Sequence, residues 1–126
     1  MLEILRLNHR IHRDERLTTH VALTARAFLA SKLYYSGQKD SSFENSIKKV
    51  NQQFGSNFSI EYTNNPLNLI KEKQQQNFKI IHLTCYGSKV KTKIKNIQKH
   101  KKILIIVGGA KVEPEYYKVS DYNISI

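Results

Sequence analysis

The sequence predicts an α/β protein built on a mainly parallel sheet with helices on both faces. Short runs rich in Ile, Leu and Val alternate along the chain with segments whose apolar residues recur at helical spacing. Strands joined in this way by helices pair in parallel, and the helices then cover both faces of the sheet. The 126 residues fit one domain, Met1–Ile126, that can bury a single core.

The N-terminal part of the chain predicts one strand and one helix. Leu2–Leu7 is a short apolar run that precedes a dense basic segment, which is typical of a strand. Leu17–Ala30 has the spacing of an amphipathic helix, and Thr18 or Thr19 is its candidate N-cap. The apolar positions that define this helix are Leu17, Val21, Ala25 and Phe28.

A second strand, a second helix and a third strand follow. Lys32–Ser36 is a short β-compatible run. A capping-box pattern predicts a helix that begins at Ser41 or Ser42, carries an apolar stripe and ends at Gly55. Phe58–Tyr62 then alternates apolar and polar residues and predicts the third strand.

The second half of the chain continues the alternation. Its most strand-like segments are Phe78–Thr84 and Lys102–Val107, because both are short runs rich in apolar, β-compatible residues. The predicted elements are, in order, a short helix Leu67–Gln76 after Pro66, a strand Phe78–Thr84, a helix Ser88–His100, a strand Lys102–Val107, a short helix from Pro114 and a strand Asp121–Ile126. Six strands and five helices are therefore expected.

The charge of the chain indicates a polyanionic partner. Lys and Arg number 21 against 10 Asp and Glu, a formal net charge of +11, and such a field attracts nucleic acid. The alternative is a lysine-rich solvated surface, since many lysines lie in Lys89–Lys102. We favour nucleic acid because arginine and histidine, not lysine, crowd the segment near the N-terminus.

That basic segment holds five arginines and three histidines within 21 residues. Arg presents a planar fork that suits phosphate oxygens and stacks on bases. We therefore predict an RNA or phosphate site, with a salt-bridge network to Asp14 and Glu15 as the alternative. The residues expected to face RNA are Arg6, His9, Arg10, Arg13, Arg16 and His20.

The chain shows no sign of a membrane or secreted protein. Cys85 is its single cysteine, so no intramolecular disulfide can form, and the residue suits a reducing compartment. No apolar run approaches the roughly 20 residues of a membrane span, and the N-terminus lacks a signal-peptide pattern. We expect a cytoplasmic protein without a membrane partner.

Two glycine turns follow the strongest strands and form a candidate ligand site. Gly108 and Gly109 follow Val107, and Tyr86 and Gly87 end the preceding strand segment. Missing Cβ atoms permit positive φ and allow backbone N–H groups to approach a ligand. Because ligands of parallel sheets bind at the carboxyl ends of strands, the two turns could enclose a flat ligand such as an adenosine. A purely structural turn is the alternative.

Several other chemistries lack their motifs. The glycine turn matches neither the GxGxxG dinucleotide fingerprint nor the GxxxxGK[ST] phosphate loop. His9 and His12 are three residues apart, but no HExxH, CxxC or acidic cluster accompanies them, so no metal site is predicted. The sequence has no GxSxG motif, and its carboxylates lack a recognisable hydrolase spacing.

Four stretches of the chain, in a fixed order, together resemble one known family. They are LRLNHRIHRDERLTTHVALTARAF, IEYTNN, IIHLTCYG and LIIVGGAKVEPEYYKVSDYN. The chain resembles the archaeal tRNA cytidine-56 2′-O-methyltransferases, which belong to the SPOUT class of trefoil-knotted RNA methyltransferases. The resemblance runs through almost the whole chain, and RDERLTTHVALTAR and HLTCYG are its most specific parts.

The resemblance implies transfer of a methyl group from S-adenosyl-L-methionine to a ribose 2′-hydroxyl in the T-loop of tRNA, by a homodimer and without a metal. It places Arg26 where the class carries an arginine that contacts the target ribose or assists its deprotonation. Because the pKa of arginine is above about 12, orienting a phosphate or stabilising negative charge is the more reasonable role. The residues that it places against the methyl donor are Leu83, Gly108, Gly109, Ala110, Lys111 and Val112.

The chain also departs from the family pattern. Ala110 stands where the family usually has an acidic residue, Asn8 and Ala22 where it has glycine, and Ile11 where it has proline. Family members also continue past the position of Ile126 into a segment that completes the donor pocket, the knot and the dimer surface. From the resemblance we therefore expect a fold that is incomplete at its C-terminus, whether shortened or naturally abbreviated.

Two functions remain open at this point, and a third ranks last. The chain is a donor-dependent tRNA ribose methyltransferase, or a basic tRNA-binding protein that lacks a complete donor pocket. Both predict tRNA binding that salt weakens, because phosphate contacts release counterions. Only the first predicts saturable binding of the methyl donor. An α/β domain with no RNA role would require the arginine cluster to be inert.

Overall fold

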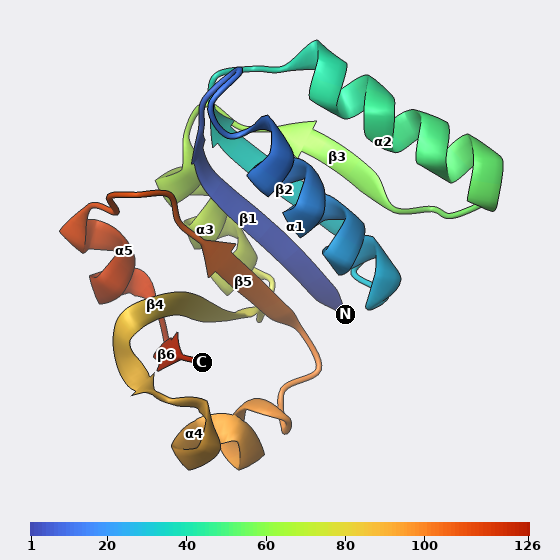
Figure 1. Ribbon diagram of the computed structural model, residues 1–126. Coiled ribbons are helices and arrows are strands. Elements are labelled where there is room, and N and C mark those ends of the chain that lie inside the picture. Colours follow the sequence, from blue (N-terminus) through green and yellow to red (C-terminus); the bar gives the residue numbers. More distant parts are fainter.

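The computed structural model describes residues 1–126 and contains one six-stranded sheet (Figure 1). All its strand pairs are parallel, so the predicted fold class is confirmed. The strands are β1 (Leu2–His9), β2 (Lys32–Gly37), β3 (Ser59–Tyr62), β4 (Lys79–Lys89), β5 (Ile103–Val107) and β6 (Tyr122–Ser125). Their order in the sheet is β3-β2-β1-β5-β4-β6.

Strand order reverses at the centre of the sheet. The chain moves outward from β1 to β3 on one side, and β5 is later inserted between β1 and β4 on the other. Leu2 pairs with Ile103 and Arg6 with Val107, so β5 ends beside Arg6 and β1 continues past it to His9. A crevice outside the carboxyl ends of such strands is the usual ligand site of an open parallel sheet.

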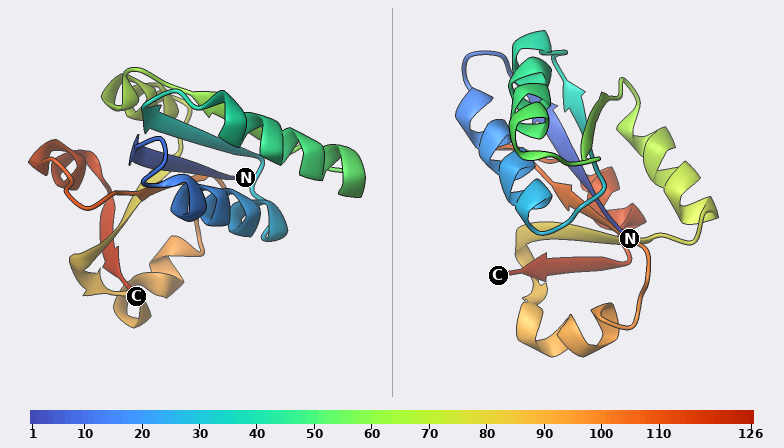
Figure 2. Two further views of the ribbon diagram at one scale, coloured as in Figure 1. Left: turned by 45° about the horizontal axis from the view of Figure 1, so that its top comes forward. Right: turned by 90° about the vertical axis from the view of Figure 1, so that its right-hand side faces the viewer.

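Helices cover both faces of the sheet, as the sequence predicts. They are α1 (Glu15–Ala27), α2 (Ser41–Phe54), α3 (Pro66–Gln75), α4 (Val90–Ile97) and α5 (Pro114–Val119). The core clusters place α1, α2 and α4 on one face and α3 and α5 on the other. The right-hand view of Figure 2 shows α1 and α2 on one side of the sheet and α3 on the opposite side.

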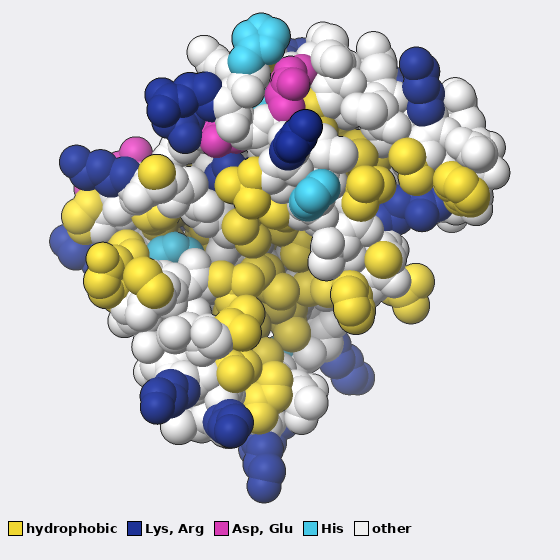
Figure 3. All heavy atoms as spheres, in the orientation of Figure 1, with side chains coloured by type: hydrophobic (Ala, Val, Ile, Leu, Met, Phe, Trp, Pro, Cys, Tyr) yellow, Lys and Arg dark blue, Asp and Glu magenta, His cyan; other side chains and the backbone are white.

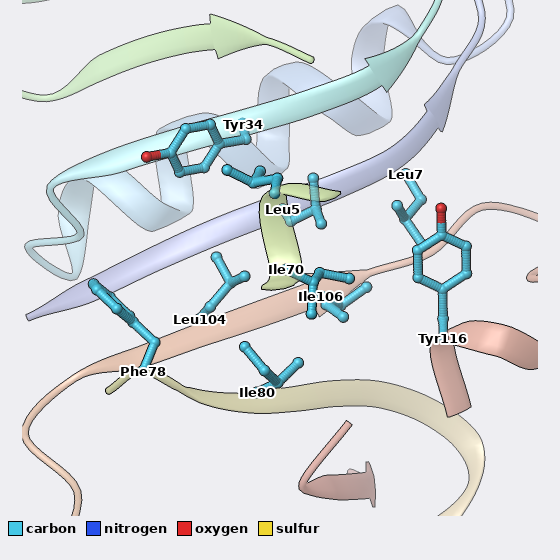
Figure 4. Close-up of a cluster of buried hydrophobic side chains, with 10 residues drawn as sticks. Leu5, Leu7, Tyr34, Ile70, Phe78, Ile80, Leu104, Ile106 and Tyr116 are labelled. Carbon is cyan, nitrogen blue, oxygen red and sulfur yellow. The ribbon is translucent and has the colours of Figure 1, made fainter. Parts of the chain in front are cut away.

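The core against α3 and α5 consists of alternate residues of the central strands (Figure 4). Leu5, Ile80, Leu104 and Ile106 are fully buried in it and lie around Ile70 of α3. Strand side chains point alternately to the two faces, so each central strand also supplies the other core. Because β1, β4 and β5 are covered on both sides, they are nearly continuous apolar runs.

The core against α1 and α2 depends on small residues in α1. Ala22 and Ala25 are buried against the sheet, where they pack with Ile4 and Leu33. Alanine adds little height to a helix surface, so α1 can lie close to β1 and β2. In α2 the larger Phe43 and Ile47 fill the space beside β2 and β3.

The start of α1 and the capping residue of α2 differ from the predicted ones, whereas α2 begins at Ser41 as predicted. α1 begins at Glu15, so Thr18 and Thr19 lie inside the helix and the predicted threonine cap is wrong. For α2, Asp40 caps the helix by accepting a hydrogen bond from the Phe43 N–H at 3.1 Å, so the cap lies one residue before the predicted Ser41. Gly55 ends α2 with a φ of 70°, as the sequence predicts.

The fourth strand is longer than predicted and bends. β4 reaches Lys89, and α4 therefore begins at Val90 and not at Ser88. β6 pairs with Leu83 before an irregular stretch and with Ser88 after it, so β4 arches around β6 (Figure 1). A Cβ on Gly87 would collide with the backbone of Asn123, which explains why a glycine lies on this bend.

Replacing Asp40 tests how strongly the carboxyl end of β1 depends on one buried carboxylate. Asp40 caps α2 and also lies 2.9 Å from Nε2 of the buried His9. We expect Asp40→Ala to lower the free energy of unfolding by about 2–3 kcal/mol, because it removes the cap and leaves a buried polar group unpaired. Asp40→Asn is the matched control, since its amide oxygen can still cap, and should cost under about 1 kcal/mol. Urea denaturation measures both, and equal losses would contradict this account.

Candidate functional site

A polar cavity of about 400 Å³ lies between the bend of β4 and the carboxyl end of β5. Leu83 pairs with Val107, so the bend of β4 starts beside the glycine turn that follows β5. The residues around the cavity come from the bend of β4, the glycine turn after β5 and α5: His82, Leu83, Thr84, Cys85, Tyr86, Gly108, Gly109, Ala110, Lys111, Val112 and Tyr117. The glycine turn therefore faces the bend of β4 that was expected to be a second turn, although Gly87 itself is not part of the lining.

The structure brings together all six residues predicted to bind the methyl donor. Leu83 lies on one wall of the cavity, and Gly108–Val112 forms the other. Gly108 and Gly109 do not use positive φ, which among glycines occurs only at Gly37 and Gly55. A Cβ on Gly108 would instead collide with the Cγ2 methyl of Val112. The turn thus needs glycine for close packing and not for a left-handed backbone.

Hydrogen bonds between β4, α5 and β6 shape the cavity wall. Nδ1 of His82 lies 3.0 Å from Oδ1 of Asn123, and the Asn123 amide donates to the Tyr117 carbonyl at 3.1 Å. The hydroxyls of Thr84 and Tyr117 are 3.0 Å apart, and the backbone N–H of Tyr86 donates to Thr84 at 3.2 Å. These bonds fix the position of α5 against the end of β4.

His82 is fully buried beside the cavity, with its ring edge-to-face against Tyr117 at a centroid distance of 4.6 Å. Burial lowers the pKa of His82 below its ordinary value of 6.5, and the bond to Asn123 offsets only part of that shift. The imidazole is therefore neutral at neutral pH.

A second polar cleft of about 310 Å³ adjoins the first at the carboxyl ends of β1 and β2. Gly109, Ala110 and Lys111 belong to both linings, so the glycine turn separates the two spaces. Asn8 enters the cleft with φ of 61°, a left-handed conformation that asparagine tolerates and glycine adopts freely. This conformation explains why glycine and asparagine can both occupy position 8.

Part of the predicted arginine cluster forms an exposed basic surface on the loop after β1 and on α1, made of Arg13, Arg16 and His20. Arg10 is half-buried and lines the cleft, where it donates two hydrogen bonds to the carboxylate of Asp14, at 2.9 and 3.1 Å. Lys111 is exposed on the glycine turn and also lines the cleft. The lining of the cleft therefore includes two basic residues.

Arg6 and His9 do not belong to that surface, and the prediction that they face RNA is wrong. Both side chains have 0% exposure. Arg6 donates from Nη1 to the Leu7 carbonyl at 2.5 Å, and its Nη2 is 3.8 Å from Asp14. Burial lowers the pKa of Arg6, while Asp14 acts in the opposite direction. Arg6 lies beneath the glycine turn, since a Cβ on Gly109 would be 3.5 Å from Nη1.

His9 supports the end of β1 from inside. Its Nδ1 is 2.7 Å from the Thr18 hydroxyl in α1, and its Nε2 is 2.9 Å from Asp40 before α2. Burial opposes ionisation of Asp40, but the hydrogen bonds from His9 and Phe43 outweigh it and lower the pKa of that carboxyl. His9 thus ties two helices to one strand. His12 is exposed, so these two histidines do not meet.

The structure separates Arg26 from the donor residues. Its Nε donates to Asn51 at 2.9 Å, and its Nη2 donates to the Gly55 carbonyl at 2.7 Å, at the C-terminal end of α2. α1 runs antiparallel to β1, so its last turn lies near Leu2, at the edge of the sheet opposite Gly108. A cation at a helix C-terminus is stabilising there. The predicted catalytic arginine therefore lies at the opposite ends of the strands from the residues predicted to bind the donor.

An apolar groove of about 410 Å³ lies on the α1 face of the sheet. It runs over β1 and β5 beside α1, and Figure 3 shows hydrophobic side chains gathered there between α1 and α4. Phe28 is 75% exposed at its edge. The other lining residues are Leu2, Ile4, His20, Val21, Thr24, Ala25, Leu83, Ile105 and Val107.

Residues 54–126 match the family model described as tRNA ribose 2′-O-methyltransferase, aTrm56. A tRNA (cytidine(56)-2′-O)-methyltransferase of Methanobrevibacter smithii is 44% identical over 126 residues, covering 99% of this chain and 70% of that protein. The Methanosphaera stadtmanae protein of the same name is 44% identical over 127 residues, covering 100% of this chain and 73% of its own length. The chain belongs to this tRNA ribose 2′-O-methyltransferase family.

Solved structures agree with that family at the level of the fold. The A. aeolicus TrmH/SpoU tRNA modifying enzyme superposes with a TM-score of 0.73 at 18% identity, covering 99% of this chain and 61% of that one. The SpoU methyltransferase AviRb from Streptomyces viridochromogenes, in complex with AdoMet, gives 0.70 at 13% identity and covers 100% and 48%. The sheet is therefore of the SpoU methyltransferase type, and this chain spans about half or somewhat more of those proteins.

The fold contains neither a membrane-spanning helix nor a metal-ligating cluster. No helix has both the length and the apolar character needed to span a bilayer. His, Cys, Asp and Glu side chains do not gather in a group of three or more that could ligate a metal ion.

Sequence reasoning missed His82, Thr84 and Tyr117 as residues of the site. All three stand inside the stretches IIHLTCYG and LIIVGGAKVEPEYYKVSDYN that carry the family resemblance. A polar residue at position 82, within a strand otherwise built from Ile and Leu, was the available signal. An ionisable side chain inside an apolar strand points to either a buried network or a site.

Proposed function

We propose that this protein methylates the ribose 2′-hydroxyl of cytidine 56 in tRNA and takes the methyl group from S-adenosyl-L-methionine. The observation that carries the proposal is the polar cavity between the bend of β4 and the glycine turn after β5, in a chain of this methyltransferase family. The family name supplies the substrate and the reaction, and the geometry supplies a place for the donor.

The residues present fit a donor of this chemistry. Gly108 leaves the backbone of the turn close to Val112, and the cavity is wide enough for a nucleoside. When bound, S-adenosyl-L-methionine supplies a methyl group on a positively charged sulfur. Nearby, a neutral His82 and the paired hydroxyls of Thr84 and Tyr117 add no positive charge that would oppose the sulfonium.

The acceptor side of the reaction is the cleft on the other side of the glycine turn. Arg10 and Lys111 line it, and Arg13 and Arg16 are exposed a few residues after Arg10 in the chain. Such side chains suit the phosphates of an RNA strand. Because the glycine turn belongs to both spaces, a ribose held in the cleft lies next to a donor held in the cavity. Such positioning supplies a large part of the rate of a bimolecular transfer.

We also propose that two copies of this chain associate through the apolar groove. Phe28 and Leu29 are exposed beside it, at 75% and 88%, and Leu17 is 51% exposed on the same helix. A contiguous apolar surface of this kind marks an association site. A closed two-fold dimer brings the same patch of each copy together, which a groove flanked by a protruding Phe28 allows.

Replacing Gly108 tests the donor site. Gly108→Ala should displace Val112 and weaken S-adenosyl-L-methionine binding by about tenfold or more, since the added methyl occupies the space of the Val112 side chain. The double variant Gly108→Ala with Val112→Ala removes the colliding methyl and should recover part of the affinity. Isothermal titration measures each. A donor that binds the single variant and the wild type equally would contradict this assignment.

Methyl transfer from labelled donor to tRNA transcripts tests the reaction itself. Transfer should require the 2′-hydroxyl of cytidine 56 and vanish when that nucleotide is 2′-deoxycytidine. Methyl transfer to the 2′-deoxycytidine transcript would show that another nucleotide is the target. Binding of tRNA without binding of the donor would favour the alternative function, a tRNA-binding protein.

Removing two exposed arginines tests the RNA surface. Arg13→Ala with Arg16→Ala should weaken tRNA binding about tenfold or more and reduce the slope of log K against log salt by roughly 2, because each phosphate contact adds about 0.9 to the slope. Lys48→Ala with Lys49→Ala removes the same charge from α2, away from the cleft, and should change the slope less. Filter binding across a salt series measures both. Equal slopes for the two pairs would place the RNA elsewhere.

Placing a charge on the groove tests association. Phe28→Glu should convert dimers to monomers, because two copies of the buried carboxylate would lie in an apolar contact. Phe54→Glu alters an equally exposed aromatic residue at the far end of α2 and should leave the mass unchanged. Light scattering after size exclusion gives the mass of each. A wild-type monomer, or a dimeric Phe28→Glu variant, would exclude this interface.

A further inference from the structure

One buried nitrogen beside the proposed donor cavity has no partner in the protein. Nε2 of His82 is buried and makes no hydrogen bond within the protein, and His82 is one of the residues that border the cavity. A buried polar atom without a partner lowers the stability of the fold. Native proteins retain such atoms at few positions, and a ligand site is one physical reason for keeping one.

The surrounding hydrogen bonds decide which hydrogen-bonding role that nitrogen has. The Asn123 amide donates through Nδ2 to the Tyr117 carbonyl, which leaves its Oδ1 as the atom that faces His82. Oδ1 can only accept, so the proton of the imidazole lies on Nδ1. In the neutral ring the other nitrogen, Nε2, then carries a lone pair and no proton.

We propose that Nε2 of His82 accepts a hydrogen bond from an N–H or O–H group of the methyl donor bound between the glycine turn and the bend of β4. This inference rests on the proposed function, since it names how the donor cavity recognises that ligand. S-adenosyl-L-methionine carries candidate groups in its adenine amine, its ribose hydroxyls and its ammonium. The proposal makes His82 a binding residue, in addition to the six on the cavity walls.

Two features of the site suit a neutral acceptor. The ligand carries a positive sulfonium, and Lys111 already places one cation on the cavity wall. A protonated histidine would add a second positive charge and would have no lone pair to offer. Tyr117 packs edge-to-face on the ring and shields it from water, so the imidazole stays neutral. Asn123 and Tyr117 thus orient His82 and select its tautomer.

Two substitutions separate the proposed contact from the structural bond. His82→Asn can still donate to Asn123 from its shorter side chain but places no acceptor at the Nε2 position. His82→Gln reaches that position with its amide oxygen but loses the Nδ1 donor. His100→Asn is the matched control, because His100 also bonds a residue near β6, Tyr122, at 3.1 Å, and lies outside the cavity.

Isothermal titration with S-adenosyl-L-methionine should show affinity reduced about tenfold in His82→Asn and within about threefold of wild type in His82→Gln and His100→Asn. His82→Gln should instead unfold at a lower temperature. Equal affinity of His82→Asn and wild type, or equal loss in both His82 variants, would overturn the proposal.

A spectroscopic readout does not depend on the variants' stability. The chain has five histidines, and the ¹⁵N spectrum of their rings separates protonated from unprotonated nitrogens. Nε2 of His82 should appear unprotonated in the free protein and shift when S-adenosyl-L-methionine is added. A ligand that binds without moving this resonance overturns the inference and leaves the proposed function standing. A wild-type chain that does not bind the ligand at all overturns both.

Discussion

The insertion of β5 between β1 and β4 is the constraint on which the rest of the site depends. Because β5 pairs with both neighbours, its end at Val107 lies between Arg6 of β1 and Leu83 of β4, where β4 begins to bend. The segment that leaves β5 has a polar space on each side, one toward β1 and one toward β4. A single short turn can therefore serve two ligands. This arrangement follows from strand order alone.

The polar core beneath that turn shows what holds the edge in place. Arg6, His9, Asp14 and Asp40 are all buried at the ends of β1 and the starts of α1 and α2. Charged groups remain buried only when partners offset their loss of hydration. Asp14 accepts from the backbone and side chain of Arg10 and lies near Arg6, so one carboxylate orders the whole loop after β1. The exposed arginines are positioned by this buried set.

Local patterns in the sequence predicted the elements well, because apolar periodicity reports burial directly. All six strands and five helices were expected, and the two glycine turns were expected to face each other. Which arginines of the cluster are buried and which are exposed could not be predicted from such local patterns. The sequence does not distinguish Arg6 from Arg13, because both are arginines of the same basic segment. Arg6 is buried because β1 pairs with β2 on one side and with β5 on the other. The separation of Arg26 from the start of α1 could be predicted from the sequence. Arg26 is 11 residues after Glu15, and a helix rises ~1.5 Å per residue, so the two lie about 16 Å apart along α1.

The glycine turn shows a packing requirement that the sequence alone does not reveal. Missing Cβ atoms were expected to permit positive φ and to let backbone N–H groups approach a ligand, but Gly108 has no positive φ, and its missing Cβ leaves room for the Val112 side chain. The two explanations differ in which other residues the turn depends on. A positive φ would tie the residue to backbone geometry alone, whereas close packing makes the turn depend on the side chain at 112. Leu83 belongs to the lining of both the polar cavity and the apolar groove, so one side chain connects the two faces of the sheet. Under the two proposals above, a copy of the chain seated in the groove would pack against a wall of the donor cavity. Any coupling between association and donor binding through Leu83 would then be reciprocal.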